Sequence, residues 1–115
     1  MVTKEQFLSN QKRYQPISLP QKFSDEEMAR DWTLSEIDIG EINKYREEYR
    51  PFVAVQLCAV RLHGRFLSDV NDLSLRIISY LNNQLGLPPS LTIRVPERKA
   101  TYTAYRKNIL THLGL

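Results

Sequence analysis

The sequence predicts an all-α fold, a compact bundle of about five to six helices with helix-turn-helix-like packing. Three observations predict it: apolar residues recur at helical spacing, N-cap residues precede several of these segments, and Gly or Pro residues separate them. The 115 residues are 42% apolar and 25% charged, which is the size and composition of a single globular domain.

Residues 1–22 are predicted to form a short N-terminal helix and a connector. Thr3 and Gln6 can form a capping box that opens this helix. Two prolines in residues 14–22 predict an extended segment, because proline lacks a backbone donor and disfavours helix in the residue before it. We expect this part to form a single folded unit with a helical domain over residues 23–115.

Two capping signals predict the next two helices. Ser24 and Glu27 form a capping box that opens a helix over residues 25–32, and Ser35 caps a helix over residues 36–47. Three residues of the second helix fall on one side and are expected to pack inward: Ile39, Ile42 and Tyr45.

The apolar run FVAVQLCAVRL, residues 52–62, is predicted to be the central, buried helix. Pro51 suits its first turn and Gly64 ends it. Its β-branched residues leave a buried strand as the alternative. The helix is favoured because the neighbouring segments are helical, so that a lone strand would have no pairing partner.

Two more helices complete the bundle. Asp72 or Ser74 caps one over residues 74–85, and Pro96 begins the last, over residues 97–113. Between them, two prolines predict a turn, with one short helical turn over residues 90–93. The expected packing stripe of the first of these helices is Leu75, Ile78, Leu81 and Leu85.

No apolar run approaches the roughly 20 residues needed to cross a bilayer, and the N-terminus lacks the basic and apolar regions of a signal peptide. The single cysteine excludes an internal disulfide and a multi-cysteine zinc site, which favours a reducing compartment. A cytoplasmic location is therefore predicted.

The sequence does not predict an enzyme, a metal site or a bound cofactor. Cys58 and His63 lie five positions apart in the sequence, about 140° apart around a helix, and are badly placed to act as nucleophile and base. Cys58 also lies in the most apolar segment, where a core thiol is expected. No glycine-rich phosphate loop occurs, and neither histidine has metal-ligand spacing.

The charge is unevenly distributed. Residues 1–50 contain eight Lys/Arg and ten Asp/Glu, whereas residues 51–115 contain eight Lys/Arg and three Asp/Glu. Such asymmetry indicates a polyanionic partner, most often nucleic acid, although a solvated basic helix face is an equally good explanation of charge alone.

The last predicted helix is the main candidate for a binding surface. One side gathers residues expected to pack inward: Tyr102, Tyr105, Ile109 and Leu113. The adjoining side gathers Lys99, Thr103, Arg106 and Lys107, and two arginines, Arg94 and Arg98, lie near its N-terminus. These residue types contact phosphates and base edges in duplex DNA, but an ordinary amphipathic surface helix accounts for the pattern equally well.

A second basic cluster, Arg61, His63 and Arg65, ends the central helix. Arg61 and Arg65 are candidate DNA contacts. Compensation of the helix C-terminal dipole explains them without any ligand.

Several segments resemble one family in consistent order. WTLSEIDIGEINKYR (32–46), FVAVQLCAVRLHGRFL (52–67), IISYLNNQLGLPPS (77–90) and ERKATYTAYRKNILTHLGL (97–115) are similar to the N-terminal domain of the Tn-three family of replicative transposases. Within the second segment, a pattern of the type F-x-x-V-Q-L-C-x-x-R-x-x-G-R-x-L is matched by Phe52, Val55, Gln56, Leu57, Cys58, Arg61, Gly64, Arg65 and Leu67.

The resemblance covers about residues 20–115, and it implies a helical module that recognises the terminal inverted repeats of a transposon in bacteria. The catalytic DDE carboxylates of the family would lie far downstream, outside this chain. The expected partner is therefore double-stranded DNA, with a second transposase chain as a further partner. Two departures concern the site: EEYRP between the third and fourth predicted helices is less basic than in relatives, and the last helix has fewer arginines.

Two other functions are weighed against DNA binding. A protein-interaction or dimerisation module is favoured by the acidic first half and by three aromatic residues: Trp32, Tyr45 and Tyr49. A small hydrolase that uses Cys58 and His63 has the least support.

Overall fold

The computed structural model describes residues 24–90 and 92–115, and in this part of the chain every regular element is a helix. The all-α prediction is therefore confirmed. The predicted N-terminal helix and most of the connector lie outside the described residues. In chain order the elements are α1 (Asp25–Asp31), α2 (Glu36–Ile42), the 3-10 helix η2 (Glu47–Tyr49), α3 (Arg50–His63), the 3-10 helix η3 (Val70–Asp72), α4 (Leu75–Gln84) and α5 (Lys99–His112).

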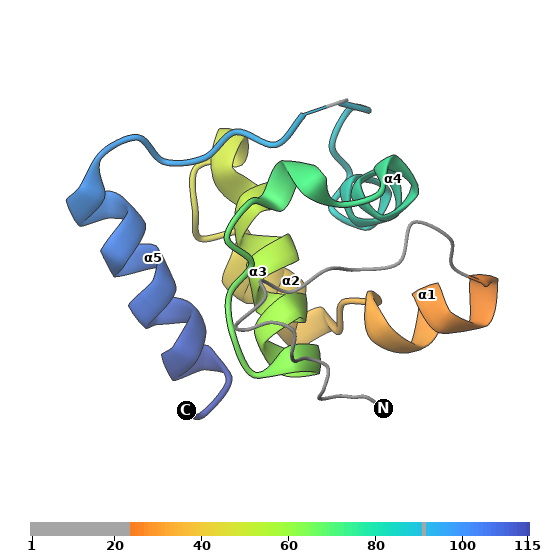
Figure 1. The fold of residues 1–115 in the computed structure, drawn as a ribbon, viewed down its shortest axis with the longest axis horizontal. Coiled ribbons are helices and arrows are strands. Elements are labelled where there is room, and N and C mark those ends of the chain that lie inside the picture. Colours follow the sequence, from red (N-terminus) through yellow and green to blue (C-terminus); the bar gives the residue numbers. More distant parts are fainter. Residues whose placement is uncertain (1–23, 91) are drawn as a thin grey trace, which may run out of the picture.

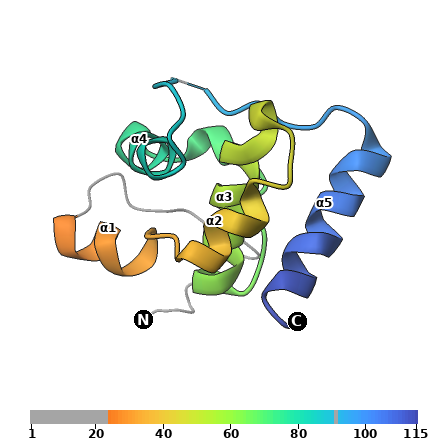
Figure 2. The same ribbon diagram turned by 180° about the vertical axis from the view of Figure 1, so that it is seen from behind.

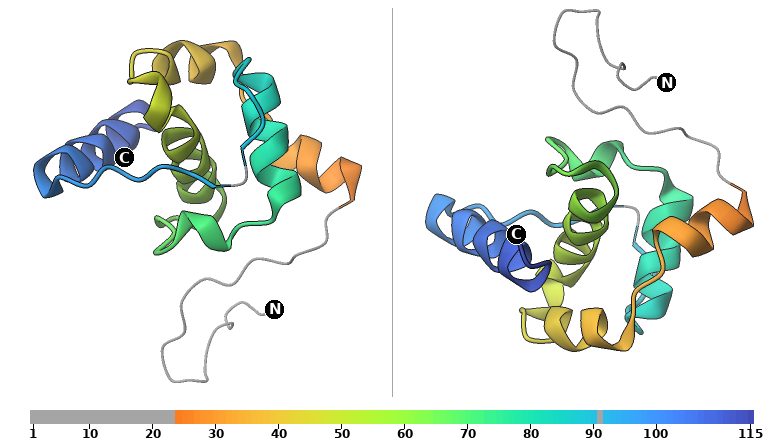
Figure 3. Two further views of the ribbon diagram at one scale, coloured as in Figure 1. Left: turned by 90° about the horizontal axis from the view of Figure 1, so that it is seen from above. Right: turned by 90° about the horizontal axis from the view of Figure 1, so that it is seen from below.

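Helix α3 is the centre of the fold, with α4 on one side and α5 on the other (Figures 1 and 3). Every residue from 52 to 60 is buried, so the whole circumference of the helix is covered. Pro51 occupies its first turn, and Gly64 ends it in the left-handed conformation, with φ 79°. The predicted central helix is thus confirmed, and the alternative of a strand is wrong.

The first two helices begin where their caps predict. Both capping boxes form: Ser24 with Glu27 and Ser35 with Asp38. Helix α2, however, ends at Ile42 rather than at residue 47. The Arg50 guanidinium donates to the carbonyl oxygens of Tyr45 and Asn43 at 3.0 Å, which satisfies acceptors of the turn that replaces the helix.

The second half of the fold differs from expectation at three places. Leu75 is 55% exposed, because the buried side of α4 is formed by Ile77, Ile78 and Leu81. Residues 90, 92 and 93 are not helical. Helix α5 begins at Lys99 rather than at residue 97, with no side-chain cap.

The helices that flank α3 are joined by long connections. Residues 64–74 lead from α3 to α4. After α4, residues 85–90 and 92–98 pass over one end of α3 on the way to α5 (Figures 1 and 2). A helix-turn-helix motif uses a turn of about three or four residues. The helix-turn-helix-like part of the expected packing therefore stays a prediction.

Three side-chain amides hold extended segments between helices by bonding to backbone groups. Gln56 donates to the Leu67 carbonyl at 2.9 Å and accepts from the Leu67 N–H at 2.8 Å. Asn71 bonds the backbone of Ile93 in the same paired way, at 3.1 and 2.8 Å. Gln84 accepts from the Leu34 N–H at 2.7 Å and donates to the Trp32 carbonyl oxygen at 3.0 Å. These pairs replace the ladder bonds that a sheet would supply to extended segments.

Among the residues that the structure describes, no helix combines the length and the apolar character that crossing a bilayer requires.

Candidate nucleic-acid interface

Helix α5 lies on the flank of the molecule and packs on α3 with one side only (Figures 1 and 3). Ile109 is its one fully buried residue, and Tyr102, Tyr105 and Leu113 are half-buried against the core. The predicted inward side is therefore confirmed. Its contacts are largely aromatic: the Tyr105 ring meets the Tyr45 ring edge-on at 4.7 Å between centroids.

The other side of α5 is exposed and carries the predicted basic residues. Lys99, Thr103 and Lys107 all face solvent. Helix α5 contains no Asp or Glu, so nothing on the helix itself neutralises these lysines. Ala100 and Ala104 are exposed on the same side and were missed by the sequence analysis, although their helical spacing would have revealed them. They leave the backbone of this face accessible.

Arg106 links α5 to the loop that follows α3. Its guanidinium carbon lies 4.4 Å from the centre of the Phe66 ring, an arrangement typical of a cation–π contact. The Gln56 amide pair fixes Leu67 directly after Phe66. Because Arg65 directly precedes Phe66, the structure brings the second predicted basic cluster next to α5.

Arg61 takes part in an ion pair that the sequence did not predict. It lies at the end of α3, and its guanidinium pairs with the Asp38 carboxylate at 2.8 Å. The Arg61 side chain stays 41% exposed, and its contact with DNA stays a prediction.

Arg94 and Arg98 lie in the extended segment that precedes α5. Asn71 fixes Ile93, and Arg94 follows with a guanidinium nitrogen 3.8 Å from the Glu48 carboxylate. Arg98 is the N-cap residue of α5 and is exposed. The structure thus places Arg98 and Lys99 at one end of the exposed α5 face, whereas Arg94 lies beside an acidic residue of η2.

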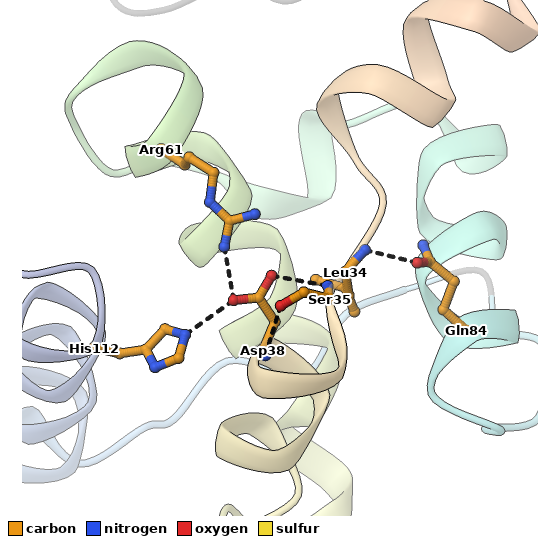
Figure 4. Close-up of polar contacts among 6 residues, drawn as sticks. All are labelled: Leu34, Ser35, Asp38, Arg61, Gln84 and His112. Atoms are coloured by element: carbon orange, nitrogen blue, oxygen red, sulfur yellow. Dashed lines mark hydrogen bonds and ion pairs between the residues drawn. The ribbon is translucent and has the colours of Figure 1, made fainter.

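Asp38 forms a buried polar junction between three helices (Figure 4). One carboxylate oxygen accepts from Arg61 at 2.8 Å and lies 2.9 Å from His112 Nε2, and the other accepts from the Ser35 N–H at 3.0 Å. Burial by itself would raise the pKa of this carboxyl group. The hydrogen bonds from His112, Ser35 and Arg61 outweigh burial and lower the pKa to about 2. Asp38 is therefore ionised at neutral pH.

Cys58 is a core thiol, as expected. It is fully buried, and burial raises its pKa to about 12, so the nucleophilic thiolate does not form at neutral pH. His63 is exposed at the end of the same helix. Within the described residues, no group of three or more His, Cys, Asp or Glu side chains is arranged to hold a metal ion.

The fold and this surface define a small helical domain with one exposed basic helix. The chain belongs to the family described as a domain of unknown function, DUF4158, which matches residues 7–115. It is also similar to the transposase for transposon Tn1546 of Enterococcus faecium, at 33% identity over 79 residues. That match covers 68% of this chain and 8% of the transposase. No solved structure matches the chain. These findings confirm a relation to a transposase, while membership of the Tn-three family stays a prediction.

Proposed function

We propose that this chain is a DNA-binding module of a bacterial transposase of the Tn-three family, acts in the cytoplasm and recognises the terminal inverted repeats of its transposon. The observation that carries the proposal is the exposed face of α5, which presents Lys99, Thr103 and Lys107 on a helix without any acidic residue. The similarity to a transposase agrees with it. The chain acts by binding, and the chemistry of transposition belongs to other parts of the full protein.

The proposed contact places α5 in the major groove. A helix of 14 residues is about 21 Å long, and the groove is about 12 Å wide, which admits one helix. Lysines along α5 and the arginines at its two flanks, Arg65 and Arg98, would neutralise phosphates on either side of the groove. Thr103, in the middle of the face, would contact base edges.

Band-shift titration tests this function. The ligand is a duplex with the inverted repeat that flanks the encoding gene, and the control is a scrambled duplex of equal length. We expect tighter binding to the repeat, with a slope of log affinity against log salt of about −4 to −5 for four to six phosphate contacts. Equal binding to both duplexes contradicts specific recognition, and no binding at low salt contradicts DNA binding altogether.

A protein-interaction module that pairs two transposase chains is the second candidate. The acidic charge of the first half favours it, whereas two of the aromatic residues expected to support it, Trp32 and Tyr45, are buried in the core. Light scattering distinguishes the two functions: a dimer that forms without DNA supports pairing, and a monomer that binds the duplex supports the first proposal.

A further inference from the structure

The junction at Asp38 is a polar contact that ties α5 to two other helices. Its Oδ1 atom accepts from Arg61 of α3 at 2.8 Å and lies 2.9 Å from His112 Nε2, in the last turn of α5 (Figure 4). The side chains of Asp38 and His112 are 6% and 12% exposed. Because the carboxylate is ionised, it accepts a hydrogen bond from His112, and water competes little for this contact.

The other contacts of α5 with the core are mainly apolar and aromatic. Ile109 is the single fully buried side chain of the helix, and the half-buried tyrosines meet other aromatic rings. The hydrophobic part of these contacts is non-directional. The hydrogen bond from His112 adds a directional contact, because a hydrogen bond weakens steeply away from its preferred distance and angle.

The second polar anchor near α5 acts on the chain before it. Asn71 fixes Ile93, six positions ahead of the first residue of α5, Lys99. It therefore limits where α5 begins, whereas the junction at Asp38 limits where α5 ends. A helix held at both ends presents its exposed face at a defined angle to the basic loop around Arg65.

We propose that Asp38 and His112 are positioning residues for DNA binding: their contact fixes α5 in the orientation in which its basic face meets the duplex. This inference rests on the proposed function of α5. His112 faces Asp38 rather than the exposed face, so it acts through the orientation of the helix and not through a contact with DNA. Loss of the contact leaves α5 in the binding orientation for a fraction of the time, and the apparent affinity falls by that fraction.

The test compares two substitutions of one residue in the 115-residue chain. His112→Ala removes the donor, whereas His112→Gln keeps an N–H group near the position of Nε2. Ser79→Ala, an exposed change on α4, is the matched control. Each variant is titrated with the inverted-repeat duplex, and amide hydrogen exchange is measured without DNA.

We expect His112→Ala to weaken binding about tenfold and to speed exchange in α5 but not in α3, while His112→Gln and Ser79→Ala stay close to the unaltered chain. Unchanged exchange in α5 of His112→Ala overturns the proposal whether or not DNA is bound. Faster exchange with unchanged affinity overturns the positioning role. If the unaltered chain binds no duplex, the proposed function fails, and the positioning role fails with it. The titration of the unaltered chain shows this outcome without any variant, so it is distinguished from a failure of the positioning role alone.

Discussion

Helices α3 and α5 have the same length, 14 residues, but α3 is largely buried and α5 is largely exposed. Residues 52–60 of α3 are buried without interruption, and α5 buries Ile109 alone. Helix α3 therefore carries most of the packing energy, because apolar burial scales with the area removed from water. Helix α5 adds less to stability and keeps most of its surface for a partner. The comparison separates the part of this domain that maintains the fold from the part proposed to bind.

The strongest test of this comparison is a cavity in α3. Phe52 is 1% exposed, and we expect Phe52→Ala to lower the free energy of unfolding by about 3–5 kcal/mol, because the substitution removes buried contacts and leaves a void. Urea denaturation measures the change. Lys107→Ala on α5 is the control, expected to stay within about 0.5 kcal/mol. Similar losses in both variants would contradict the division of roles.

Acid unfolding tests the junction between the two helices. The pKa of Asp38 is lowered from 3.8 to about 2 in the folded state, so its stabilisation is fully present above pH 3.8 and is lost as the pH falls towards 2. Linkage gives about 2 kcal/mol for this shift. Urea denaturation at pH 5 and pH 2.5 should show a smaller loss for Asp38→Asn than for the unaltered chain. Equal losses in the two proteins would contradict the contribution of this carboxylate.

Removing charge from the exposed face of α5 should affect binding and not folding. We expect Lys99→Ala with Lys107→Ala to weaken binding to the duplex about tenfold and to reduce the salt slope by about 2, one for each phosphate contact. The matched control removes Arg30 and Lys44, which are exposed on α1 and next to α2. If the control weakens binding as much, general charge and not α5 governs the affinity.

The smallest expected effect concerns the contact between Arg106 and the Phe66 ring. Arg106→Met keeps an unbranched apolar side chain and removes the cation, and a loss of about 0.5–1 kcal/mol in stability is expected. A double-mutant cycle with Phe66→Leu measures the coupling between the two residues. Zero coupling would mean that the loop around Arg65 is placed beside α5 by the Gln56 pair alone.

Capping signals in the sequence predicted where α1, α2 and α4 begin. Ser24, Ser35 and Ser74 all cap helices, as expected, because a cap acts within a few residues of itself. The predicted end of α2, residue 47, was wrong, because the end of this helix depends on hydrogen bonds from the Arg50 guanidinium to the carbonyl oxygens of Tyr45 and Asn43. Leu75 was assigned to the wrong side of α4, because periodicity alone does not say which of two adjacent apolar stripes the core covers.

The candidate site also has features that the sequence predicts and contacts that it does not predict. The inward and outward sides of α5 follow from helical period, so the exposed positions of Lys99, Thr103 and Lys107 were predictable. The partner of Arg61 was not, since Asp38 is distant in sequence and reaches Arg61 through the packing of α2 on α3. The same holds for the stack of Arg106 on Phe66.

The sequence by itself determined that this chain is helical, that residues 52–62 form its centre and that its basic charge gathers towards the C-terminus, because composition, period and capping act over short distances. Only the tertiary structure decided that α5 stays uncovered on one side, that Arg61 pairs with the buried Asp38, and that Gln56, Asn71 and Gln84 hold extended segments between helices. Each of these depends on which groups the folded chain brings within hydrogen-bonding distance, and long-range packing alone decides that.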